Sequence, residues 1–138
     1  MTAEAAQDTE HLRLLSIFHY VVAGLQGLFA CFPVLHFAIG AVLVFLPEQL
    51  NDGKAGPPPV LVGWFFMLFA GAWILVGLTL AACIAIAGRN LAQRRRYLFC
   101  LVMAGVEAAT CMPLGTVLGV FTILVLMRPT VKEAFGVS

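Results

Sequence analysis

Three long apolar blocks dominate this chain and restrict what it can fold into. They cover residues 14–46, 60–87 and 97–127. Each block exceeds the ~20 residues that a helix needs to cross a hydrocarbon core of ~30 Å. The first block as one straight helix would be about 50 Å long, so each block is a tilted helix, a kinked helix or a hairpin. The sequence therefore predicts an all-α integral membrane protein.

Composition supports the same class. The chain is 62% hydrophobic and only 11% charged, with a mean hydropathy of +0.99, whereas soluble domains carry about 25% charged residues. The net charge of +1 argues against nucleic-acid binding, which needs a basic face. We expect one transmembrane domain over residues 1–138, with a polar tail at 1–13 and an amphipathic tail at 128–138.

The distribution of lysine and arginine distinguishes the possible topologies. The linker at 88–96 carries four arginines, and short basic loops remain in the cytoplasm. Three single spans place five of the eight basic residues inside, and five spans place six inside. Folding the third block back at 112–115 places seven inside and leaves Lys54 outside. This favours about four spans with both termini cytoplasmic, although the short arms of that hairpin leave three to five spans open.

Glu107 is the one acid inside the apolar blocks. A central carboxylate costs roughly 2.5–3.5 kcal/mol on insertion scales, so it needs a polar partner, a wet cavity or a ligand. Residues 23–26 (Ala-Gly-Leu-Gln) are echoed by residues 104–107 (Ala-Gly-Val-Glu), which is either a repeat of the kind found in transporters or a chance similarity. If both blocks enter from the cytoplasm, Gln26 and Glu107 lie about 15–18 Å deep. We expect a neutral Glu107 to hydrogen-bond the Gln26 amide.

Two interpretations of Glu107 and Gln26 remain open. Intramembrane acids mark functional sites by default, which makes this pair a candidate proton or ion site. Interhelical hydrogen bonds also stabilise membrane helices by about 0.6–2 kcal/mol, which makes the pair a structural clamp. His19 and His36 lie seventeen residues apart on one segment, and we expect both to have hydrogen-bonded packing roles.

Small residues predict where helices approach each other closely. Gly115 and Gly119 form a G-x-x-x-G pattern, and Gly105 with Ala109 repeats the small-x-x-x-small spacing. Such spacing permits close backbone contact between membrane helices. We expect these four residues to form helix contacts.

No constellation of catalytic, metal-binding or cofactor-binding residues is evident. The four cysteines all lie inside apolar blocks and form no C-x-x-C pair, which argues against a redox dithiol or a zinc site. We therefore expect no enzyme activity, no metal and no cofactor.

Residues 113–122 (PLGTVLGVFT), their continuation through 128–132 (RPTVK) and residues 11–20 (HLRLLSIFHY) resemble small uncharacterised multi-pass inner-membrane proteins of bacteria. The resemblance covers about a quarter of the chain. It implies a bacterial inner-membrane location and carries no activity with it.

These observations favour a small multi-pass protein that forms an oligomeric conduit for an ion or small solute. The alternative is a non-catalytic auxiliary or scaffold subunit of a larger membrane complex. The expected partners are the lipid bilayer and either further copies of this chain or other subunits.

Overall fold

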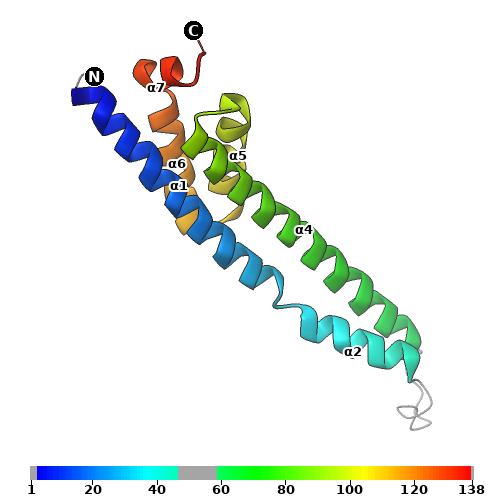
Figure 1. Cartoon of the computed structure of the whole chain (residues 1–138). Helices are drawn as coiled ribbons and strands as arrows, with labels where there is room; N and C mark the ends of the chain where they lie inside the picture. The colour runs from blue at the N-terminus through cyan, green and yellow to red at the C-terminus, as the bar shows by residue number, and fades with distance from the viewer. Residues whose placement is uncertain (1–2, 47–58, 138) are drawn as a thin grey trace. The chain divides into compact units, whose positions relative to one another are not determined.

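The computed structural model describes residues 3–46 and 59–137, and within them the chain is helical with no strand. The all-α class is confirmed. The linker that carries Lys54, expected on the outer side, lies outside the described residues. The helices, labelled in Figure 1, are α1 (Ala3–Ala30), α2 (Val34–Phe45), α4 (Pro59–Gln93), α5 (Tyr97–Thr110), α6 (Leu114–Leu126) and α7 (Pro129–Ala134).

Two helical stretches are long and apolar enough to cross a membrane. Ala6–Phe45 has 40 residues and Val60–Gln93 has 34, with mean hydropathies of 2.4 and 2.3. Only 11% and 17% of their most apolar windows are buried within the described chain, so these helices are unlike the covered core helices of soluble domains. With 14 and 13 residues, α5 and α6 are about 21 and 20 Å long. They are shorter than a hydrocarbon core of ~30 Å, so the structure does not show four full spans.

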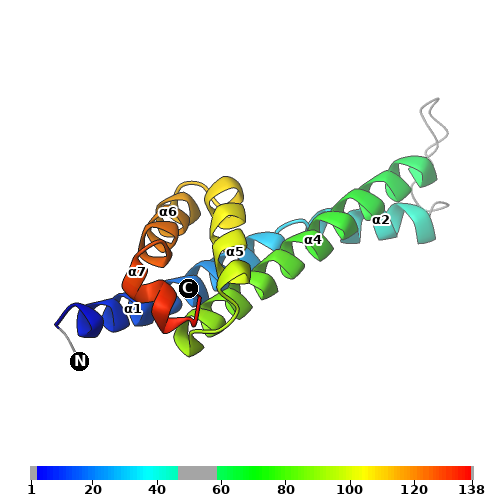
Figure 2. The same cartoon turned by 90° about the horizontal axis from the view of Figure 1, so that it is seen from above.

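Prolines mark the breaks within the first and third apolar blocks. The turn at 31–33 ends in Pro33 and separates α1 from α2, and the turn at 111–113 ends in Pro113 and separates α5 from α6. Proline lacks a backbone N–H and clashes with the preceding turn, so it starts helices and does not continue them. The third block therefore folds back near the expected position, and Figures 1 and 2 both show α5 beside α6.

Only the last three residues of the predicted linker at 88–96 form the reversal between α4 and α5, because residues 88–93 continue α4. Arg94 and Arg96 both have a φ of 52°, a left-handed conformation that costs a non-glycine residue roughly 1–2 kcal/mol. The side chains of Arg89, Arg94, Arg95 and Arg96 are all exposed. The linker thus presents its four charges to the surroundings while the backbone turns within three residues.

The chain divides into two compact units. The first unit comprises Met1–Gln26 and Leu80–Ser138, and the second comprises Gly27–Thr79. The core of the first unit contains large side chains from α1, the end of α4, α5, α6 and α7, including Leu12, Ile84, Leu91, Leu126 and Val131. The tail at 128–138 contributes α7, and the Phe135 ring packs edge-on against Tyr97 at 5.8 Å.

The second unit is a pair of helical segments joined by close backbone contacts. A Cβ on Gly40 would lie 2.8 Å from the Gly63 carbonyl oxygen, and a Cβ on Gly63 would lie 2.8 Å from the Gly40 oxygen. Glycine at both positions therefore sets the distance between α2 and α4. His36 is exposed on α2 and stacks on Phe66, with ring centroids 6.1 Å apart.

Candidate functional site

A buried histidine–glutamate pair lies inside the first unit. His19 on α1 and Glu107 on α5 both have 0% exposure, and His19 Nε2 lies 3.1 Å from Glu107 Oε2. This contact is not a hydrogen bond, and Nε2 and both carboxylate oxygens lack a hydrogen-bond partner among the described residues. The pair is close enough for a proton to pass between the two side chains after a small adjustment.

The hydrogen bond of the other ring nitrogen of His19, Nδ1, shows which ring nitrogen carries the hydrogen. Nδ1 is 2.8 Å from the Leu15 carbonyl oxygen, which can only accept, so Nδ1 carries a hydrogen. With a hydrogen on Nδ1, Nε2 is the nitrogen that faces the Glu107 carboxyl group.

The position of His19 follows from the buried face of α1. Leu12, Leu15, His19, Val22 and Ala23 recur at intervals of three and four residues, and all are buried. This is the spacing of one helix face. A histidine on that face must enter the interior of the first unit rather than face its surroundings.

Glycine and serine bring α4 against this face of α1. A Cβ on Gly88 would lie 3.0 Å from His19 Cβ and 3.1 Å from the Ser16 carbonyl oxygen, and the Ser16 hydroxyl donates to the Gly88 carbonyl at 2.7 Å. A larger residue at Gly88 would displace the backbone around His19. The serine contact then holds the two helices in register.

Gly115 and Gly119 bring α6 against α5 beside Glu107. A Cβ on Gly115 would lie 2.7 Å from the Glu107 carbonyl oxygen and 3.2 Å from its Cγ. A Cβ on Gly119 would overlap the Ala104 carbonyl oxygen and lie 2.8 Å from Ala108 Cβ. The α5–α6 contact therefore encloses the Glu107 side chain.

Gly105 and Ala109 lie away from that contact. A Cβ on Gly105 would meet nothing within 4 Å among the described residues, and Ala109 is exposed. These two members of the expected small-residue pattern occupy the outer side of α5.

The expected pairing of Glu107 with Gln26 is wrong, because Glu107 faces His19. The Gln26 amide oxygen instead lies 3.6 Å from the Cys111 thiol, which donates to it. That expectation assumed that the apolar blocks beginning at residues 14 and 97 enter the membrane at the same depth. In the structure, Glu107 lies beside a residue two turns of α1 earlier, about 10 Å from the level of Gln26.

His19 is the site residue that sequence reasoning assigned only a packing role. The signal that identifies it is its spacing from other polar residues on the buried face of α1. Asp8, Ser16 and His19 are buried and Gln26 is half-buried. Together they place polar groups at intervals along about 27 Å of helix, with Asn90 contributing a buried amide nitrogen that has no hydrogen-bond partner among the described residues.

The first of these polar residues on α1, Asp8, forms a hydrogen-bonded ion pair. Arg128 Nη1 donates to Asp8 Oδ1 at 2.8 Å, and the Thr130 hydroxyl donates to the other carboxylate oxygen. Asp8 lies in the polar first turns of α1, before the apolar stretch that begins at Leu14. The Thr130 hydrogen bond, followed by the hydrogen bond and charge of Arg128, holds the pKa of Asp8 below its ordinary value, although burial opposes this shift.

No further reactive cluster occurs in the described part of the chain. All four cysteines are free, and no group of three His, Cys, Asp or Glu residues is placed to hold a metal ion there. The chemistry available at the His19–Glu107 pair is therefore proton binding or hydrogen bonding.

Comparisons with protein-family models, with curated proteins and with solved structures each give no match. Fold and site together define an all-helical protein with two helices of membrane-spanning length and composition. Its first unit contains a buried pair of titratable side chains.

Proposed function

We propose that this chain is a four-span protein of the bacterial inner membrane, with both termini cytoplasmic, that assembles as an oligomer and conducts protons. The observation that carries the proposal is the fully buried His19–Glu107 pair, with 3.1 Å between Nε2 and Oε2. An acid within a membrane-spanning region is costly, and such residues mark proton and ion pathways. A histidine and a carboxyl group within reach of each other are groups that a proton relay uses.

The polar residues inside the first unit favour conduction of protons over conduction of a larger solute. The polar residues along α1 provide separate steps, and the Ser16 hydroxyl and the Asn90 amide lie in the same unit as the pair. Because His19 and Glu107 are both fully buried, conduction requires the first unit to open enough for water to reach the pair. A conduit for protons needs water to reach the pair only transiently, whereas a conduit for a solute needs a permanent polar opening.

The alternative proposal is a non-catalytic auxiliary or scaffold subunit. The tight α5–α6 contact at Gly115 and Gly119 favours it, because close approach of small residues is how membrane helices associate. In that case the His19–Glu107 pair serves only to hold α1 against α5.

Proton flux into liposomes containing a pH-sensitive dye distinguishes the two proposals. We expect the wild-type chain to conduct under an imposed potential and Glu107→Gln to lose at least tenfold of that flux, since an amide cannot release a proton. Glu133→Gln is the matched control, because Glu133 is an exposed acid on α7. Size-exclusion chromatography verifies that both variants keep the wild-type assembly.

Flux that is absent from the wild type, or that survives Glu107→Gln, would contradict the conduit. The scaffold is supported if no flux is found and Gly119→Leu abolishes assembly or co-purification of partners. Gly105→Leu is the control for that measurement, because open space surrounds Gly105.

A further inference from the structure

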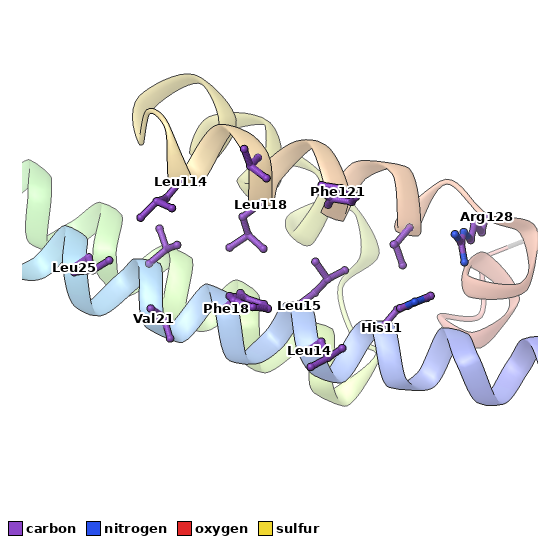
Figure 3. A pocket seen from close by; sticks show the side chains of 13 residues that line it. His11, Leu14, Leu15, Phe18, Val21, Leu25, Leu114, Leu118, Phe121 and Arg128 are labelled. Atoms are coloured by element: carbon purple, nitrogen blue, oxygen red, sulfur yellow. The ribbon is translucent and has the colours of Figure 1, made fainter.

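An apolar groove runs between α1 and α6 in the first unit. Its cavity volume is about 540 Å³, and its walls are aliphatic and aromatic side chains such as Phe18, Val21, Leu118 and Phe121. Figure 3 shows the lining side chains distributed along α1 and α6, with Leu15 and Leu118 lying between the two helices. This volume lies within the ~300–1,000 Å³ range of small-molecule sites, so the groove is large enough for a ligand.

The groove has the length of one lipid leaflet. Its α1 wall extends from His11 to Leu25, which corresponds to about 21 Å of helix. Half of a hydrocarbon core is about 15 Å thick, so an extended acyl chain from one leaflet fits along it. A helix of that length and ~5 Å radius occupies roughly 1,600 Å³, about three times the cavity volume, and would rest on the groove rather than enter it.

One end of the groove is polar and basic. His11 and Arg128 line it there, as Figure 3 shows. The Nδ1 atom of His11 is buried and has no hydrogen-bond partner among the described residues. Buried polar atoms are nearly always hydrogen-bonded, so this nitrogen can form a hydrogen bond with a ligand at this end of the groove.

Arg128 supplies the complementary charge. Its side chain is 49% exposed, and Nη1 is the guanidinium atom that binds Asp8. A guanidinium has five N–H donors in a planar fork suited to phosphate. Arg128 therefore has donors to offer a phosphate while it keeps the ion pair with Asp8.

We propose that the groove binds one acyl chain of an anionic phospholipid, with the lipid phosphate held by Arg128 and His11. Basic pockets between membrane helices on the cytoplasmic side are suited to anionic headgroups. This site is separate from the His19–Glu107 pair, since neither of those two residues lines the groove.

Quenching of a groove tryptophan by brominated lipids tests the proposal. The reporter is Phe121→Trp in a chain in which Trp64→Phe and Trp73→Phe remove the native tryptophans. The chain is reconstituted in phosphatidylcholine vesicles that contain equal small fractions of brominated phosphatidylglycerol or brominated phosphatidylcholine. We expect phosphatidylglycerol to associate about fivefold more strongly, the factor that one basic residue contributes near an anionic surface.

Two substitutions separate headgroup binding from the integrity of the fold. Arg128→Gln removes the charge and the Asp8 ion pair, and we expect it to abolish the preference. Asp8→Asn breaks the same ion pair but leaves Arg128, so we expect the preference to be kept or increased. A preference lost equally in both variants would show that only the fold had changed and would overturn the proposal.

A tryptophan outside the groove tests whether the lipid preference is specific to the groove. Trp73 lies exposed on α4 in the second unit, so the Trp64→Phe chain with Trp73 as the reporter should show no preference between the two lipids. Equal preference at both reporters would indicate general attraction to the protein surface. Equal quenching of the groove tryptophan by both lipids, or displacement of phosphatidylglycerol by millimolar inorganic phosphate, would also overturn the proposal.

Discussion

The two units of this chain differ in the residues that are buried between their helices. In the second unit every buried residue that the structure describes is glycine or alanine: Ala30, Gly40, Gly63, Ala70 and Gly77. In the first unit the interior contains all eight of the largest fully buried side chains, and two of them are His19 and Glu107. The second unit is held by close backbone approach, whereas the first combines close approach at its glycines with the packing of large side chains around a polar pair.

This difference has a physical reason and a functional consequence. Helices in lipid gain little from burying apolar side chains, so small residues that allow close contact determine where they meet. The second unit follows this rule, and its large apolar residues, such as Phe65, Leu68 and Leu75, are exposed. The first unit has such contacts too, at Gly88, Gly115 and Gly119, and in addition it encloses the His19–Glu107 pair. The buried titratable pair therefore lies in the first unit, whereas the second unit exposes large apolar side chains.

The largest expected effect comes from removing one member of the polar pair. His19→Leu leaves the Glu107 carboxyl buried beside an apolar side chain, and an unsatisfied buried polar group costs about 1–3 kcal/mol, or more if it is charged. We expect the first unit to open more often, which speeds maleimide labelling of the buried Cys100 in a chain whose other three cysteines are replaced by alanine. Fluorescence of Trp64 and Trp73, both in the second unit, should change little.

The double variant His19→Leu/Glu107→Leu is the decisive control for that prediction. Replacing a buried pair by apolar residues is often neutral, so labelling of Cys100 should return towards the wild-type rate. Gln26→Leu should have a smaller effect than His19→Leu, because Gln26 has only a weak thiol contact at 3.6 Å. A rate that is unchanged in His19→Leu would contradict the importance of the pair.

The second unit should instead be sensitive to one added methyl group. In Gly63→Ala the new Cβ would lie 2.8 Å from both the Gly40 carbonyl oxygen and Leu43 Cβ, so the helices must separate. Overpacking of this kind costs about 1–3 kcal/mol. We expect a lower detergent-denaturation midpoint, followed by tryptophan fluorescence.

Gly71→Ala is the matched control for Gly63→Ala, since its Cβ would meet the Phe37 ring at an ordinary 3.5 Å. Alanine is favoured over glycine inside a helix by about 1 kcal/mol, so Gly71→Ala should be neutral or stabilising. Equal losses in the two variants would show that glycine flexibility, rather than close approach, matters in this unit.

Local sequence patterns predicted much of this structure and one half of its site. Apolar block length and the proline positions predicted helices and the fold-back that separates α5 from α6. Glu107 was identified as an interior group because a lone acid in an apolar block has few other places to go. These inferences depend only on the composition and order of neighbouring residues.

The partners of those residues depend on tertiary arrangement and were not predicted. His19 lies opposite Glu107 because of how far α1 is shifted along its axis relative to α5. The number of residues between the two helices does not predict that shift. The contacts of Gly40 with Gly63 and of Gly88 with Ser16 likewise depend on which helix faces lie together. A small residue shows that close approach is possible, but not which helix approaches.

The smallest expected effect is electrostatic and concerns Asp8 at the polar end of the first unit. Hydrogen bonding by Thr130 and Arg128 lowers the pKa of Asp8 in the folded state. A lowered folded-state pKa gives stability that is present above the unfolded-state value of about 3.9 and is lost as the pH falls through the folded-state value. Asp8→Asn should therefore be less stable than the wild type at pH 6, by up to about 1 kcal/mol for a pair at the surface.

The stability difference between wild type and Asp8→Asn should shrink as the pH is lowered from 6 towards 3, measured by Cys100 labelling. Thr130→Val should reproduce part of the loss at pH 6, because it removes the strongest contribution to the lowered pKa. Glu10→Gln, at an exposed acid on the same helix, should show no such dependence. The second unit has no acid among its described residues, so its tryptophan signal should stay constant over this range. A pH-independent difference at Asp8 would show that the contact stabilises α1 by packing rather than by charge.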